Sequence, residues 1–221
     1  MNNTIKITLF LIIFISVIAL GIFGISKIEV DDFKKASVIF LLDASASNQK
    51  NLSAQKMSLR RLCSMLDPED HVKIIRVSED AYIIYEGSAQ SGSEIRKVMD
   101  KFTQYNSNEY GTAYGDALKK AFNYSIVMSK QGYIPSVVVI GDLENEGATQ
   151  KQINWTSLPS QIKNVKKQNP DFAMMFLYAD PLKLDMIKEK LLPVLGENKL
   201  TIGNEVTTNK SLRRFLQSIG R

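Results

Sequence analysis

The stretch Ser37–Leu42 reads SVIFLL and is followed at once by the polar residues 43–47, which read DASAS. A continuous apolar run rich in β-branched side chains is typical of a β-strand that is buried on both faces. Such strands occur in parallel sheets whose two faces are covered by helices. This stretch therefore predicts an α/β fold with a polar loop at the carboxyl end of its first strand.

Strands and helices alternate along the rest of the chain. The segments 72–77 and 82–85 are separated only by Ser78-Glu79-Asp80, which predicts a hairpin and one antiparallel edge strand. Further strands are expected at 136–140, 172–178 and 200–202, and helices at about 51–66, 93–102 (with Ser93 as N-cap), 114–130, 182–191 and 211–219, together with a lysine-rich helix that ends at 169. This order predicts a three-layer, doubly wound, mostly parallel sheet.

Three polar segments follow the strands or open the helices of this predicted sheet. They are residues 43–47 (DASAS), 111–118 (GTAYGDAL) and 141–144 (GDLE). In open α/β sheets, ligands bind outside the carboxyl ends of the strands, where the strand order reverses. We therefore expect the three segments to meet at that edge and to form a ligand site.

The side chains of these segments are suited to a hard cation. In an extended or turning segment alternate residues point the same way, so Asp43, Ser45 and Ser47 can converge. Thr112 adds a hydroxyl and Asp142 adds a second carboxylate. Oxygen ligands of this kind suit Mg²⁺, which usually keeps several waters. Because hydroxyls outnumber carboxylates, we expect the cation to retain positive charge and to leave a position open for a partner's carboxylate.

With these motifs in place, the chain resembles the von Willebrand factor A domain family, in its membrane-anchored bacterial type. DASAS at 43–47, GTAYGDAL at 111–118 and VVVIGDLENEG at 137–147 match the three loops of the family's metal-ion-dependent adhesion site. The resemblance covers about residues 36–219. It implies Mg²⁺ or Mn²⁺ as the cofactor and a protein ligand with an exposed Asp or Glu. Its metal ligands here would be Asp43, Ser45, Ser47, Thr112 and Asp142.

Three residues depart from the family pattern. Gly141 stands where the family often has threonine, and Leu143 stands where glycine is common. Asn48 follows the first motif in place of a small or apolar residue. Glu144 and Glu146 lie nearby and are expected to be solvated loop residues. The departures in the third loop affect how closely Asp142 would approach a cation.

Three functions follow from this site. The first is a cation-dependent protein-interaction module without enzymatic activity. The second is a scaffold domain with a vestigial metal site, and the third is a metal-dependent hydrolase or phosphatase on the same fold. An aspartyl-phosphate enzyme would need a second carboxylate near Asp43, whereas position 45 is serine, and the sequence has no nucleophile elbow or P-loop motif.

The N-terminal residues 7–26 contain no charged side chain and are flanked by Lys6 and Lys27. A helix of this length spans about 30 Å, which is enough to cross the hydrocarbon core of a membrane. A cleaved signal peptide, with Ala19 and Gly21 before the cut, is the alternative to a transmembrane anchor. We expect an anchor at 1–27, a linker at 28–35 and an extracytoplasmic domain at 36–221, in the periplasm or at the cell surface.

Composition narrows the class of partner. The net charge is +5, and the densest lysine cluster, Lys163, Lys166 and Lys167, falls in a predicted helix, which is typical of a solvated helix face. Without an arginine-rich tract we expect no nucleic-acid binding. Cys63 lies in an apolar helical run and is expected to be a buried structural thiol. The single histidine, His71, is expected to begin a strand without a catalytic role.

Overall fold

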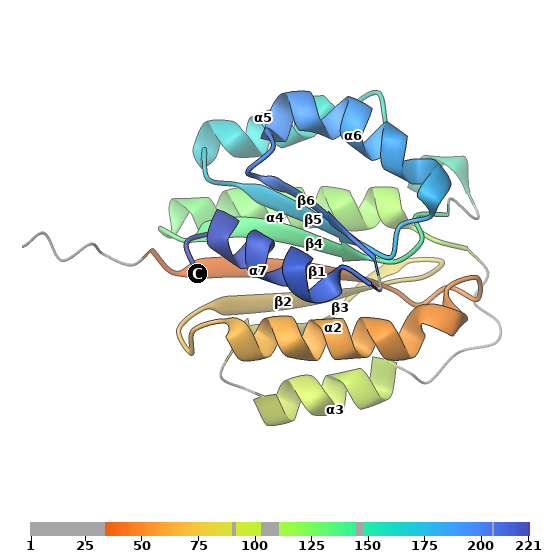
Figure 1. Cartoon of the computed structure of the whole chain (residues 1–221), viewed down its shortest axis with the longest axis horizontal. Coiled ribbons are helices and arrows are strands. Elements are labelled where there is room, and N and C mark those ends of the chain that lie inside the picture. Colours follow the sequence, from red (N-terminus) through yellow and green to blue (C-terminus); the bar gives the residue numbers. More distant parts are fainter. Residues whose placement is uncertain (1–33, 90–91, 103–110, 145–147, 205) are drawn as a thin grey trace, which may run out of the picture. The chain divides into compact units, whose positions relative to one another are not determined.

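A computed structural model of the chain describes residues 34–89, 92–102, 111–144, 148–204 and 206–221 (Figure 1). Its strands are β1 (Ala36–Asp43), β2 (His71–Val77), β3 (Ala81–Ser88), β4 (Ile134–Ile140), β5 (Ala173–Leu177) and β6 (Leu200–Gly203). Its α-helices are α2 (Leu52–Met65), α3 (Gly92–Phe102), α4 (Tyr114–Lys130), α5 (Leu158–Gln168), α6 (Pro181–Leu195) and α7 (Thr208–Ser218). Two short 3₁₀ turns occupy Gln49–Asn51 and Thr149–Lys151.

The strands form one 6-stranded sheet in the order β3-β2-β1-β4-β5-β6. All neighbouring pairs are parallel except β2 and β3, so the predicted antiparallel edge strand is confirmed. The chain winds outward from β1 to β3 and then, starting again at β4, outward to β6. The strand order therefore reverses between β1 and β4, and a ligand site is expected at their carboxyl ends.

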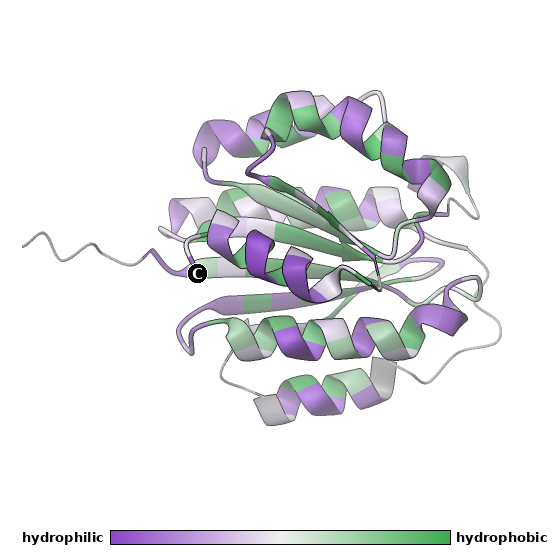
Figure 2. Cartoon of the chain, viewed as in Figure 1, coloured by the Kyte–Doolittle hydropathy of each residue, from purple (hydrophilic) through white to green (hydrophobic). Residues whose placement is uncertain are grey.

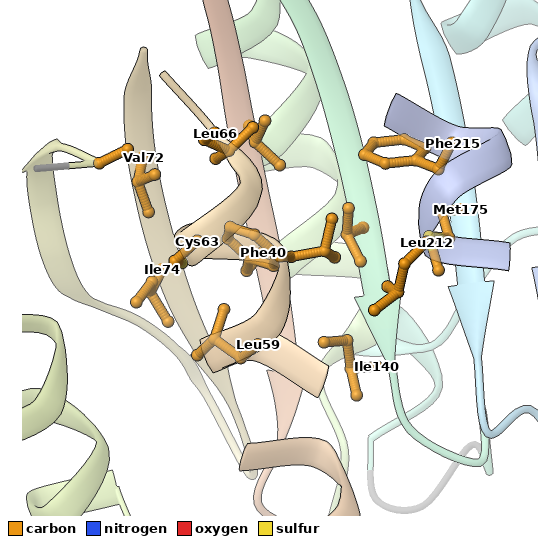
Figure 3. Packing of buried hydrophobic residues seen from close by; sticks show 14 of the residues in the cluster. Phe40, Leu59, Cys63, Leu66, Val72, Ile74, Ile140, Met175, Leu212 and Phe215 are labelled. Carbon is orange, nitrogen blue, oxygen red and sulfur yellow. The ribbon is translucent and has the colours of Figure 1, made fainter. Parts of the chain in front are cut away.

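Helices cover both faces of the sheet, which confirms the three-layer arrangement (Figure 1). Successive residues of β1 alternate between the two cores: Phe40 packs beneath α2, α3 and α7, whereas Ile39 and Leu41 pack beneath α4, α5 and α6. Figure 3 shows Phe40 packed among residues of α2 and the neighbouring strands, with Phe215 of α7 close by. Complete burial on both faces explains why the strand reads as an unbroken apolar run.

Several element ends differ from the prediction. β3 runs to Ser88, whereas the prediction ended at Tyr85. The prediction stopped early because the side chains on one face of β3 are exposed, and polar residues there interrupt the apolar pattern. Helix α6 continues through Pro193 to Leu195, since Leu191 and Leu195 both pack into the core, and ends at Gly196, whose φ of 81° suits glycine. Helix α3 begins at Gly92, so the predicted N-cap role of Ser93 is wrong.

The structure also bears on the predicted places of Cys63, His71 and the lysine cluster. Cys63 is buried on α2, and burial raises the pKa of its thiol to about 12. His71 begins β2. Lys163 and Lys167 are exposed on α5 as expected, but the Lys166 ammonium donates hydrogen bonds to the carbonyls of Val194 and Leu195 at the end of α6 (2.9 and 3.3 Å). A cation at that end also complements the helix dipole.

The predicted membrane segment 7–26 and all but the last two residues of the predicted linker 28–35 lie outside the described residues, and both stay predictions. Within the part that the structure describes, no helix is long and apolar enough to cross a membrane. Residues 34–221 form one compact unit by themselves.

Candidate metal centre

The first predicted ligand, Asp43, is the last residue of β1 and is completely buried. It is paired in register with Val77 at the end of β2, and Ala44 continues the pairing with a backbone hydrogen bond to the Val77 carbonyl (2.8 Å). On the other side of β1, Leu42 is paired with Ile140, so Gly141 leaves the sheet beside Asp43. The first and third loops therefore meet at the predicted switch point of the sheet.

The first loop folds back on the Asp43 carboxylate. The Ser45 backbone amide donates a hydrogen bond to Asp43 Oδ1 (2.8 Å), and the Ser45 and Ser47 hydroxyls lie 3.1 Å apart. The Asn48 side-chain amide donates to the Asp43 carbonyl (3.2 Å), which gives the departure at this position a structural role. Ser45 is buried and Ser47 is half-buried, so the hydroxyl pair reaches from the interior toward the surface.

The second loop places Thr112 at the same edge of the sheet. The Ala113 amide donates to the carbonyl of Ser78, just beyond the end of β2, at 2.7 Å. Thr112 is 1% exposed, and its hydroxyl oxygen has no hydrogen-bond partner among the described residues. Buried polar atoms are rarely left unpaired, because each one loses its hydration without compensation. An oxygen ligand left free in this way fits a site that is completed from outside.

Tyr114 is a site residue that sequence reasoning missed. It is fully buried at the start of α4, and its hydroxyl donates a hydrogen bond to Asp43 Oδ2 (2.7 Å). A Cβ atom on Gly141 would lie 2.0 Å from that hydroxyl oxygen and 2.4 Å from the Cβ of Asp43. Glycine at 141 therefore leaves the space that Tyr114 occupies. The steric fit between Tyr114 and Gly141, which are 27 positions apart, cannot be recognised in a single sequence.

The third loop holds Asp142 in a fixed but strained segment. Asp142 is 8% exposed; its Oδ1 accepts the Glu144 amide (2.9 Å), and its carbonyl accepts the Asp180 amide (2.9 Å). Leu143 has a φ of 64°, a left-handed conformation that costs a residue with a Cβ about 1 kcal/mol or more. Its side chain is completely buried, and this burial offsets the strain. Glu144 is half-buried, and Glu146 lies outside the described residues.

The two carboxylates have no cationic partner among the residues that the structure describes. Burial, opposed by the Ser45 and Tyr114 hydrogen bonds and reinforced by repulsion from Asp142, raises the pKa of Asp43 to about 7. Burial and the nearby Asp43 also raise the pKa of Tyr114 well above its ordinary value. Within the described ranges no lysine, arginine or histidine forms an ion pair with either aspartate.

The structure thus joins part of the predicted ligand set directly. Hydrogen bonds link Asp43 to Ser45 and Ser45 to Ser47, and Asp142 lies within electrostatic reach of Asp43. Thr112 has no such bond, and its loop reaches Asp43 through Tyr114. In the described part of the chain, no group of three or more His, Cys, Asp or Glu side chains is placed to hold a metal ion. The predicted site is not such a group, since it has only two carboxylates and its other oxygen atoms are hydroxyls. Two carboxylates with three hydroxyls are hard oxygen donors, which fit Mg²⁺ or Mn²⁺.

Comparison with known proteins supports the predicted fold. A family model described as the von Willebrand factor type A domain matches residues 38–145, which include all five predicted ligands. The fold is accordingly α/β and von Willebrand factor A-like. A search of curated proteins found no match.

Three solved structures illustrate the structural likeness. A von Willebrand factor type A protein from Catenulispora acidiphila is 16% identical, with a TM-score of 0.61 over 85% of this chain and 43% of its own. Proximal thread matrix protein 1 from the mussel byssus, solved with a zinc-occupied MIDAS motif, is 16% identical, with a TM-score of 0.58 over 81% of this chain and 45% of its own.

The third structure is an aerotolerance-related membrane protein from Bacteroides fragilis. It is 18% identical, with a TM-score of 0.59 over 84% of this chain and 98% of its own. At these identities the likeness concerns the fold alone. This chain spans less than half of the length of the first two structures.

Proposed function

We propose that residues 36–221 form a von Willebrand factor A domain that binds an acidic residue of a partner protein through a divalent cation. One observation carries the proposal. Asp43 and Asp142 lie buried within electrostatic reach of each other and have no ion-pair partner among the described residues. At the same edge of the sheet, the buried Thr112 hydroxyl has no hydrogen-bond partner among those residues. Buried carboxylates are normally paired, because an isolated buried charge is costly. A divalent cation bound at this edge supplies the missing charge and an open coordination position for a carboxylate.

Each residue of the site has a distinct role in this proposal. Asp43 and Asp142 supply the negative charge, whereas the hydroxyls of Ser45, Ser47 and Thr112 supply neutral oxygen ligands. This ratio leaves net positive charge at the site for an incoming Asp or Glu side chain. The hydrogen bonds from the Ser45 amide and the Tyr114 hydroxyl hold the Asp43 carboxylate in one orientation.

The proposal extends to the location of the domain. Residues 7–26 would anchor the chain in a membrane, with the domain on the extracytoplasmic side. The fold neighbour from Bacteroides fragilis, described as a membrane protein, supports this placement. Because position 45 is serine rather than a second carboxylate, we propose a binding role and no enzymatic activity.

A scaffold domain with a vestigial metal site is the second candidate. It is favoured by the third loop, where Leu143 takes a left-handed conformation at the position where the family commonly has glycine. Such a domain would bind its partner through other surfaces and would be indifferent to divalent cations.

Thermal unfolding of the full chain in a nonionic detergent separates the two candidates. We expect millimolar Mg²⁺ to raise the Tm, because a ligand that binds only the native state stabilises it by mass action. The variant Asp43→Asn should lose this rise, while Asp185→Asn, which changes an exposed aspartate of α6, should keep it. An intact chain that shows no Tm change with Mg²⁺ or Mn²⁺ would favour the scaffold.

A further inference from the structure

A surface rich in cations lies on helices α2 and α7. The two helices lie side by side on one face of the sheet, since both contribute to the same core and the Arg61 guanidinium donates a hydrogen bond to the Asn209 side chain (2.7 Å). Their sequences contain no Asp or Glu. They carry the cations Lys56, Arg60, Arg61, Lys210, Arg213 and Arg214. Figure 2 shows α7 with strongly hydrophilic bands along its visible side.

A groove of about 910 Å³ runs between α7 and the turn before β6. Its lining alternates cations with side-chain amides, among them Lys210, Arg213, Asn198, Asn209 and Gln217. A smaller groove of about 250 Å³ lies between α2 and α7 and shares Asn209 and Arg213 with the first. Arg213 therefore stands on the ridge between two hollows that together flank α7.

Most of the cations in the large groove are not neutralised. Lys199 is an exception, because it pairs with Asp171 (3.1 Å) and donates to the Ser218 carbonyl (2.7 Å). Arg214 donates only to a backbone carbonyl, that of Glu197 (2.8 Å). Among the described residues, Lys210 and Arg213 have neither an ion pair nor a hydrogen-bond partner. The nearby acids among the described residues are the exposed Glu197 and the half-buried Asp171, of which Asp171 is already paired with Lys199, so the described lining keeps a positive surplus.

The geometry points to a docking groove for an acidic polypeptide segment of a partner protein. Lysine and arginine side chains attract its carboxylates, and the guanidinium of Arg213 can bind one of them in a bidentate way. The amides of Asn198, Asn209 and Gln217 offer donors and acceptors that match a peptide backbone.

Other anionic partners fit this groove less well. The described residues that line it include no aromatic side chain, so they offer bases no stacking platform of the kind that single-stranded nucleic acids use. It is hollow rather than convex and has no apolar side chain in its lining to enter a lipid surface. The groove is lined by residues of α7 and of the turn before β6 and uses none of the predicted metal ligands, so this proposal stands apart from the metal centre.

The test uses the full chain in nonionic detergent and a fluorescein-labelled oligoglutamate peptide, followed by fluorescence anisotropy with EDTA present. Chelation excludes binding through the metal centre. We expect saturable binding that weakens as salt rises, because the contacts are between charges near the surface. The variant Lys210→Glu/Arg213→Glu/Arg214→Glu should bind at least about tenfold more weakly.

A matched variant, Lys119→Glu/Lys163→Glu/Lys167→Glu, makes the same change in net charge at exposed lysines of α4 and α5. Its affinity for the peptide should be within about twofold of that of the unaltered chain, since α4 and α5 cover the opposite face of the sheet from α7. If the α7 variant does not fold, Lys210→Gln/Arg213→Gln should still weaken binding by about threefold or more.

Three results would overturn the inference. Equal losses in the α7 variant and the matched variant would show attraction to net charge alone. Unchanged binding in a folded α7 variant would place the peptide elsewhere. Tighter α7-dependent binding of oligothymidylate, or of vesicles rich in phosphatidylserine, would replace the acidic polypeptide with a nucleic acid or a membrane.

Discussion

A buried aspartate lies at each end of strand β1, and the two aspartates differ in whether the chain supplies a counter-ion. At the amino end, Asp70 accepts hydrogen bonds from the amides of Ala36 (2.7 Å) and Asp67 (2.9 Å) and is paired with the Arg221 guanidinium (Nε at 2.8 Å). At the carboxyl end, Asp43 is equally buried and accepts hydrogen bonds from Ser45 and the Tyr114 hydroxyl, but no cationic side chain among the described residues pairs with it. The chain supplies a counter-ion to the first carboxylate, whereas we propose that a bound cation supplies it to the second.

This contrast separates a structural charge from a functional one. Removing one partner of a complete buried pair leaves the other charge uncompensated, which is strongly destabilising. A buried carboxylate without a counter-ion already destabilises the native state, so replacing it with a neutral side chain should raise the free energy of unfolding or leave it unchanged. The same chemical change should therefore have opposite effects at the two ends of β1.

The largest effect is expected at the amino end. Asp70→Asn should lower the free energy of unfolding by about 3–5 kcal/mol, because the Arg221 guanidinium, 7% exposed, would lose its buried carboxylate partner and keep only the exposed Asp67. Urea unfolding monitored by circular dichroism measures this change. Asp43→Asn, measured without divalent cations, is the matched substitution and should leave stability unchanged or raised. Equal destabilisation by both variants would break the contrast.

The second effect is a pH dependence that belongs to the carboxyl end. The folded pKa of Asp43 is about 7, above the ordinary value of 3.8, so its contribution to stability is fully present below pH 3.8 and is lost as pH rises through 7. In EDTA, the unfolding free energy of the unaltered chain relative to Asp43→Asn should fall on the order of 2–4 kcal/mol between pH 4 and pH 8. Parallel pH curves for the two proteins would contradict this assignment.

The smallest of the three effects tests the packing of the metal centre. Gly141→Ala should destabilise the protein by about 1–3 kcal/mol, because the added Cβ would meet the Tyr114 hydroxyl and the Cβ of Asp43. Gly92→Ala is the control, since a Cβ there meets nothing within 4 Å. Thermal unfolding compares the two variants. A change at Gly141 no larger than the one at Gly92 would mean that Tyr114 does not depend on a glycine opposite.

The sequence was most informative where neighbouring residues alone decide the structure. The apolar runs predicted the parallel strands because those strands are buried on both faces. The spacing of Asp43, Ser45 and Ser47 predicted one convergent loop, whose hydrogen bonds the structure shows. The end of β3 was harder to place, since one face of that edge strand is exposed and its pattern resembles a loop.

What escaped prediction depends on pairs that are distant in the chain. Tyr114 reaches Asp43 across 71 positions, and Arg221 reaches Asp70 across 151. Neither partner carries a local signal, because tyrosine at the start of a helix and arginine after one are both common surface residues. Only the folded structure shows that Tyr114 and Arg221 are the long-range partners of these two buried carboxylates.

The left-handed residue Leu143 links the metal centre to the interior of the protein. Its side chain belongs to the core beneath α4, α5 and α6, while the next residue toward the N-terminus, Asp142, faces the predicted cation site. A change in core volume at this position would also rotate the backbone that carries the aspartate. The residue at 143 is therefore constrained both by core packing and by the backbone conformation next to Asp142. In natural relatives it should change together with its core neighbours rather than alone.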